Sequence, residues 1–115
     1  MYRKELYSVI EAAEALDWNV TYEKNGNRYE FNFQKYSPEE QDFNIYTGEV
    51  ETIQDLVDEL FTQYECYDAS EAAYLWLDNT GHGTNGAPYE MIDVYNDMKA
   101  CEEMLYELQE KISNL

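Results

Sequence analysis

The sequence predicts an α+β fold in which an N-terminal helix is followed by a three-stranded antiparallel meander and then by three helices packed on the sheet. Two periodicities lead to this prediction. Apolar residues recur every three or four positions in residues 2–16, 51–66 and 89–113, as on one face of a helix, but they alternate with polar residues between positions 18 and 47, as in a half-buried strand. The length of 115 residues fits a single domain spanning residues 1–115.

The first half of the chain contains the predicted sheet. A helix is expected over residues 2–16 and ends before Trp18, where the period of the apolar residues changes to two. Residues 25–27, Asn-Gly-Asn, tolerate the positive φ of a tight turn, so the strands that flank them form the predicted hairpin. Residues 37–40, Ser-Pro-Glu-Glu, predict a second turn, after which a third strand ends before Gly48.

The second half is predicted to be helical. An amphipathic helix is expected over residues 51–66, and a short buried helix begins at Asp68, which with Glu71 resembles a helix start. Residues 79–88, Asn-Thr-Gly-His-Gly-Thr-Asn-Gly-Ala-Pro, end this helix, and the last helix covers residues 89–113. We interpret the glycine-rich segment as a tight connection between helices and not as a phosphate site, because it contains no Lys.

Charge indicates the kind of partner. The chain has 25 Asp and Glu against 7 Lys and Arg, a net charge of −18. Residues 1–48 hold nine acids and five bases, whereas residues 49–115 hold sixteen acids and two bases. Such a field attracts cationic surfaces and repels nucleic acids and anionic membranes. Disorder is not expected, because 44% of the residues are apolar and 16% are aromatic.

The sequence contains no strong motif for catalysis, a cofactor or a metal. The single histidine, His82, lacks partners for a zinc site, and the surrounding loop departs from a calcium loop because its last acidic ligand is displaced to Glu90. Acid pairs are so numerous that none marks an active site. We expect a non-enzymatic protein with no cofactor and no metal, in which the isolated Cys66 and Cys101 stay reduced.

The expected location is cytoplasmic. No apolar run approaches the roughly 20 residues that a membrane span requires. Glu5, Glu11 and Glu14 interrupt the N-terminal region, which distinguishes it from a signal peptide.

Rows of carboxylates are the candidate site. Glu90, Asp93 and Asp97 lie at three- and four-residue spacing, which places like charges side by side on a helix at a cost of a few tenths of a kcal/mol per pair. That cost favours a functional surface, although a solvated face that maintains solubility is the alternative. Exposed tyrosines among the acids suit an interface. The candidate partner-binding residues are Asp55, Asp58, Glu59, Tyr67, Asp93, Tyr95, Asp97, Glu103 and Glu107.

The stretch from Ala72 to Leu108 resembles a group of small acidic proteins carried by phages and conjugative elements of gut bacteria. The resemblance rests on a Trp-bearing short helix, an Asn-Gly loop, a Gly-Ala-Pro step and a closing helix with the pattern E-x-M-L-x-x-L, here Glu102 to Leu108. It implies a mobile-element origin. In size, charge and aromatic content the chain is also similar to anti-CRISPR and antirestriction proteins, which implies a counter-defence role.

We therefore expect an inhibitor that acts as an acidic DNA mimic on the basic DNA-binding groove of a host nuclease, with a Cas9-type effector as the favoured target. Two alternatives stay open. One is an antirestriction mimic that uses the same surface, and the other is a mobile-element adaptor that binds through apolar contacts. The expected partner is a protein, with no direct contact to nucleic acid or membrane, and the inhibitor is a monomer or a homodimer.

Overall fold

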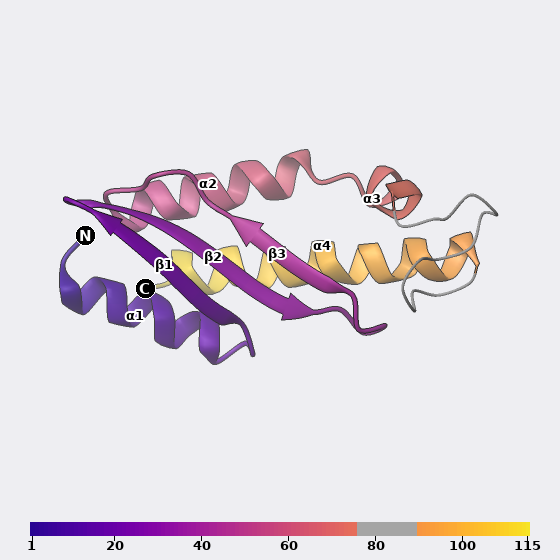
Figure 1. Cartoon of the computed structure of the whole chain (residues 1–115), viewed down its shortest axis with the longest axis horizontal. Coiled ribbons are helices and arrows are strands. Elements are labelled where there is room, and N and C mark those ends of the chain that lie inside the picture. The colour runs from indigo at the N-terminus through magenta and orange to yellow at the C-terminus, as the bar shows by residue number, and fades with distance from the viewer. Residues whose placement is uncertain (76–89) are drawn as a thin grey trace.

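The computed structural model describes residues 1–75 and 90–115. Their elements follow the order that the sequence predicts, and the α+β fold class is confirmed. The glycine-rich connection with His82 and Pro88 lies outside the described residues. The elements are α1 (Arg3–Glu14), β1 (Asn19–Asn25), β2 (Arg28–Tyr36), β3 (Asp42–Tyr46), α2 (Ile53–Cys66), α3 (Ala69–Leu75) and α4 (Met91–Ser113), as Figure 1 shows.

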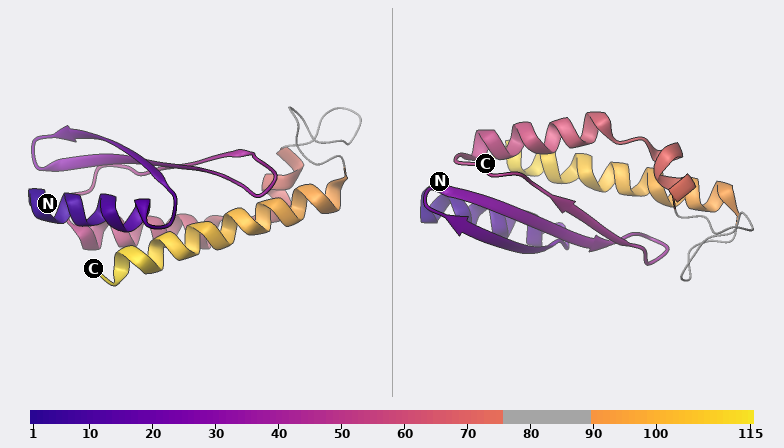
Figure 2. Two further views of the ribbon diagram at one scale, coloured as in Figure 1. Left: turned by 90° about the horizontal axis from the view of Figure 1, so that it is seen from below. Right: turned by 45° about the horizontal axis from the view of Figure 1, so that its top comes forward.

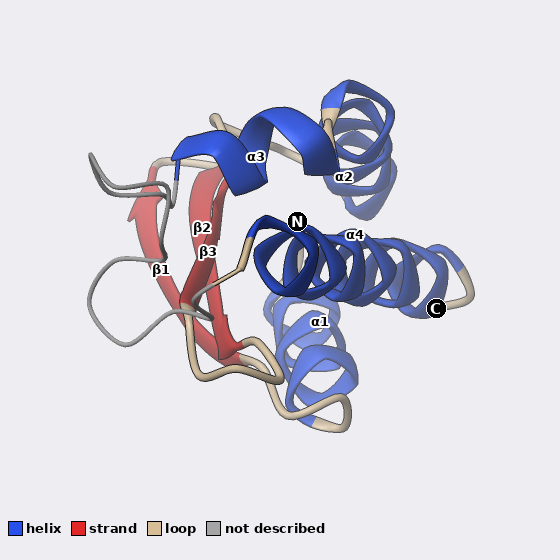
Figure 3. Ribbon diagram, turned by 90° about the vertical axis from the view of Figure 1, so that its right-hand side faces the viewer, coloured by secondary structure: helices blue, strands red, loops and turns tan. Residues whose placement is uncertain are grey.

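The three strands form an antiparallel sheet in the order β1-β2-β3. Its register aligns Phe33 of β2 with Val20 on one side and Ile45 on the other. Alternate residues of β2, namely Tyr29, Phe31 and Phe33, are all buried because they point toward the helices. The described helices lie on this face of the sheet (Figure 3).

The helices form a layer in which α4 lies between α1 and α2 (Figure 3). The main core fills the space between this layer and the sheet, and its fully buried side chains contribute roughly 1.5–3 kcal/mol each. α4 extends beyond α1, and α3 packs against the N-terminal half of α4 (Figure 2). Ala73, Val94, Met98 and Cys101 form a smaller core there. The main core includes Trp18, Phe31, Phe33, Leu56, Leu60, Leu105, Leu108 and Ile112.

Capping residues and local hydrogen bonds determine where the helices begin and end. Thr52 and Asp55 form a capping box at the start of α2, in which the Asp55 amide donates to Thr52 Oγ1 over 3.0 Å. The Asp68 carboxylate accepts hydrogen bonds from the amides of Ser70 and Glu71, which confirms the predicted start of α3. At the end of α1, Asp17 adopts a φ of 69°, and the Trp18 amide donates to the carbonyl of Ala13.

Both cysteines are free thiols, as expected, with Cys66 exposed and Cys101 buried. Within residues 1–75 and 90–115, no helix has the combined length and apolar character that crossing a membrane requires.

Candidate partner-binding surface

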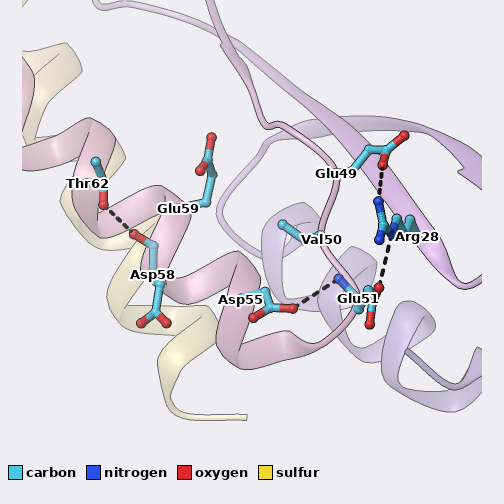
Figure 4. Close-up of a pocket in the computed structure, with 8 residues that line it drawn as sticks. All are labelled: Arg28, Glu49, Val50, Glu51, Asp55, Asp58, Glu59 and Thr62. Atoms are coloured by element: carbon cyan, nitrogen blue, oxygen red, sulfur yellow. Dashed lines mark hydrogen bonds and ion pairs between the residues drawn. The ribbon is translucent and has the colours of Figure 1, made fainter.

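A group of five carboxylates surrounds a shallow depression between α2 and the connection that leads into it from β3 (Figure 4). We call this depression the acidic hollow. It is lined by Arg28, Glu49, Val50, Glu51, Asp55, Asp58, Glu59 and Thr62. Three of the predicted partner-binding residues, Asp55, Asp58 and Glu59, therefore lie together. The helical spacing places Asp58 and Glu59 one turn after Asp55, and the preceding connection adds Glu49 and Glu51.

Arg28 is the one cation in the lining of the acidic hollow. Its Nη1 donates to Glu49 over 3.0 Å and its Nε to Glu51 over 3.0 Å. The hydrogen bond to Glu49, followed in size by the one to Glu51, raises the pKa of the Arg28 guanidinium above its ordinary value. Arg28 thus compensates the two acids of the connection, while no ion pair reaches the acids of α2 within the described part of the chain.

The three acids of α2 differ in how far they are already used within the protein. The Asp55 carboxylate accepts from the backbone amides of Glu51 and Thr52 at 3.2 and 3.3 Å, so it fixes the start of the helix. Glu59 is half-buried and accepts from the amide of Gly48 at 3.3 Å. Asp58 is exposed, and its carboxylate accepts one side-chain hydrogen bond, from Gln54. Asp58 is therefore the member of the trio most available to a partner.

Asp97 does not belong to the exposed surface that its helical spacing predicts. Its side chain is only 3% exposed. Its carboxylate accepts a hydrogen bond from Ser37 Oγ at 2.5 Å and another from the backbone amide of Glu39 at 3.1 Å. The connection between β2 and β3 folds over this part of α4 and covers the carboxylate. The expectation of a continuous row through Glu90, Asp93 and Asp97 is therefore wrong, and Asp97 holds the connection in place.

The remaining acids of α4 are exposed but lie apart. Asp93 borders a small depression with Pro38 and Glu39 at the N-terminal end of α4, which is the end near α3. Glu103 and Glu107 lie on the outward side of the same helix, roughly 15 and 21 Å further along at a rise of 1.5 Å per residue. The α4 acids therefore form two separate groups and not one strip.

The predicted aromatic anchors Tyr67 and Tyr95 are half-buried and pack against the smaller core. The Tyr67 hydroxyl donates to Met98 Sδ at 3.6 Å, and burial raises the pKa of Tyr67 above its ordinary value. Both rings line a depression that also contains the ion pair between Lys99 and Glu102. They lie away from the acidic hollow, and much of each ring already contributes to the fold.

Sequence reasoning did not identify Arg28, Glu49 and Glu51 as site residues. The alternation Glu49-Val50-Glu51 directly before the capping box was the available signal, because Val50 is buried and turns both acids outward. The pairing with Arg28 could not be read from the chain, since it joins residues more than 20 positions apart.

Neither a metal-binding group among the described residues nor similarity to a known protein indicates a function for this chain. Among the described residues, no group of three or more His, Cys, Asp and Glu side chains is arranged to hold a metal ion. No family model, curated protein or solved structure matches the chain. The exposed acidic surface is thus the feature on which a functional proposal rests.

Proposed function

We propose that this protein is a non-enzymatic inhibitor of a host defence nuclease, of the anti-CRISPR type, that presents carboxylates to the basic DNA-binding groove of a Cas9-type effector. In that groove Arg residues read the short motif next to the target by bidentate contacts to guanine. Carboxylates form bidentate pairs with the same guanidinium groups. The inhibitor would therefore compete with DNA for its recognition site.

One observation carries the proposal. In residues 1–75 and 90–115, Arg28 and Lys99 are the cations that form ion pairs, and they engage just three carboxylates, those of Glu49, Glu51 and Glu102. A chain with a net charge of −18 therefore keeps most of its carboxylates without an internal counter-charge. Such a surface gains free energy when a cationic partner approaches. The resemblance of residues 72–108 to mobile-element proteins supports a counter-defence role.

The first experiment measures DNA binding and cleavage by a panel of Cas9-type nucleases, with the protein added before or after the DNA. Inhibition when the protein is added first, but not when it is added second, is the expected result, because a DNA mimic cannot enter an occupied groove. Equal inhibition in both orders would contradict competition for DNA. No effect on any nuclease of the panel would contradict the Cas9-type target.

Charge reversal then locates the contact surface. We expect Asp58→Lys with Glu65→Lys on α2 to weaken binding to the nuclease by at least tenfold, because two exposed carboxylates become repulsive. A second variant, Glu103→Lys with Glu107→Lys, tests the outward side of α4 in the same way. None of the four positions forms an ion pair in the described residues, so the fold should persist.

The matched control is Glu11→Lys with Glu14→Lys on α1. Both residues are exposed, and this double change alters the net charge by the same amount as the other two. Binding within twofold of the wild type is expected for the control. If all three variants lose the same affinity, net charge and not a particular surface determines binding. If none loses affinity, the acidic surface is not the contact.

An adaptor function is the second candidate, and exposed aromatic residues favour it. Phe61 and Tyr106 are 44% and 41% exposed, and Tyr106 lies 5.2 Å from Tyr64 between the centroids of the rings, so α2 and α4 share an apolar seam. Binding through this seam should survive high salt, whereas a charge-led complex weakens as the Debye length shortens. An antirestriction mimic would behave like the Cas9 inhibitor toward salt but would block restriction or modification enzymes instead.

A further inference from the structure

A second depression, between α1 and the sheet, has the opposite electrostatic character. It encloses about 350 Å³, which falls within the usual range of small-molecule sites. No carboxylate lines it, in a chain with 25 acidic residues. We call it the tyrosine hollow, and it is lined by Met1, Tyr2, Arg3, Leu6, Tyr7, Tyr22, Lys24 and Tyr29.

Two side-chain cations of the tyrosine hollow, Arg3 and Lys24, are held over aromatic rings. Arg3 Cζ lies 5.9 Å from the ring centroid of Tyr7, and Lys24 Nζ lies 5.9 Å from that of Tyr29. Within the described residues neither cation forms an ion pair with a carboxylate. Arg3 comes from α1 and Lys24 from β1, so each wall of the hollow carries a cation that forms no ion pair in the part of the chain that the structure describes.

Tyr22 leaves an aromatic surface open in the same place. The register aligns it with Phe31, which is 2% exposed, yet Tyr22 is 43% exposed. Its ring centroid lies 5.9 Å from that of Tyr29, and the two planes are inclined at 56°. Tyr7 on the opposite wall is 50% exposed. The lining of the hollow therefore offers three partly exposed rings, those of Tyr2, Tyr7 and Tyr22.

Exposed rings beside uncompensated cations suit one class of ligand. A planar aromatic group stacks on tyrosine, and a phosphate accepts charge-assisted hydrogen bonds from Arg and Lys. We propose that the tyrosine hollow binds a nucleotide, with the base against Tyr7 and Tyr22 and the phosphate between Arg3 and Lys24. We expect the ligand to be a free mononucleotide and not part of a longer nucleic acid. The acidic remainder of the molecule repels a longer polyanion. Salt screens this repulsion over about 8 Å, so the nearby Arg3 and Lys24 still attract a small phosphate.

Titration with AMP, followed by ¹H–¹⁵N NMR, tests the proposal on the full chain. The expected result is saturable binding in the millimolar range or tighter, with shifts concentrated at residues 3–7, 22–24 and 29. Adenosine and inorganic phosphate, each alone, should bind at least tenfold more weakly than AMP, because each engages half of the site. A single-stranded tetranucleotide should also bind more weakly than AMP.

The decisive variant is Arg3→Ala with Lys24→Ala, which should weaken AMP binding at least tenfold. Both residues are exposed, so the fold should persist. Lys4→Ala with Lys111→Ala is the matched control, because it removes the same charge from exposed positions outside the lining of the hollow, and its affinity should stay within twofold of the wild type.

Four outcomes would overturn the proposal: no saturable shift with millimolar AMP, equal losses in the two double variants, phosphate binding as tight as AMP, or tighter binding of the tetranucleotide. These results are independent of the nuclease assays, since the tyrosine hollow contains none of the acids proposed to contact the nuclease.

Discussion

The Asp97 carboxylate is buried and makes hydrogen bonds within the protein, so it is not part of the exposed acidic surface. Asp97 accepts hydrogen bonds from Ser37 Oγ and from the Glu39 amide, while Ser37 Oγ in turn accepts from the Gln41 amide at 2.9 Å. The three bonds close the connection between β2 and β3 and hold it on α4. Buried polar groups of this kind are costly to leave without a partner.

We predict that Asp97→Ala lowers the free energy of unfolding by about 1–3 kcal/mol, because Ser37 Oγ and the Glu39 amide lose their acceptor. Urea denaturation measures this change. Asp93→Ala is the control, since Asp93 is exposed on the same helix, and a change within about 0.5 kcal/mol is expected there. Equal effects of the two substitutions would show that the buried network contributes no stability beyond that of a surface acid.

At the scale of elements, the β1–β2 turn shows how one residue type determines a connection. Gly26 adopts a φ of 65°, and the strands pair up to Asn25 and Arg28, so Gly26 and Asn27 form a two-residue loop. Asn27 is not among the residues with positive φ, although the sequence suggested that the whole Asn-Gly-Asn segment could adopt it. A glycine at the first loop position with positive φ is typical of a type II′ turn.

Gly26→Ala should destabilise the protein by about 1–2 kcal/mol, because an L-residue with a Cβ disfavours this backbone conformation. Nothing lies within 4 Å of the position where the Cβ would be, so the effect would be conformational and not steric. Gly48→Ala is the control at a glycine without positive φ, and thermal unfolding of both variants gives the comparison. An unchanged midpoint for Gly26→Ala would contradict the assigned turn.

Helical spacing predicted which acids share a face, but it could not show what covers that face. On α2, Asp55, Asp58 and Glu59 do lie together around the acidic hollow. On α4 the same reasoning failed at Asp97, because the covering segment lies 60 positions earlier in the chain. The spacing rule is local, whereas burial depends on contacts between distant segments.

For the whole molecule, unbalanced charge should oppose folding. Ion pairs in the described residues engage three carboxylates, so mutual repulsion among the others favours an expanded chain. Raising KCl from about 0.01 to 1 M shortens the Debye length from roughly 30 to 3 Å and screens this repulsion. We therefore predict that the midpoint of thermal unfolding rises by about 5 °C, which is equivalent to about 1 kcal/mol for a domain of this size.

Calorimetry across a KCl series measures that rise. The variant with Glu11→Lys and Glu14→Lys carries less net negative charge and should show a smaller increase than the wild type. A midpoint that falls with KCl, or that rises equally in both proteins, would indicate that self-repulsion does not limit stability.

The fold class, the order of the elements and the acidic character of the molecule can all be read from the sequence. These follow from apolar periodicity, turn residues and composition, which are properties of neighbouring positions or of simple counts. Which charges are exposed, and which lie together, depends on how the elements pack. Asp97 is buried, Arg28 is joined to Glu49 and Glu51, and Arg3 and Lys24 lie beside exposed tyrosine rings without forming an ion pair in residues 1–75 and 90–115. Each of these outcomes depends on segments that are distant in the chain and meet only when the helices pack on the sheet.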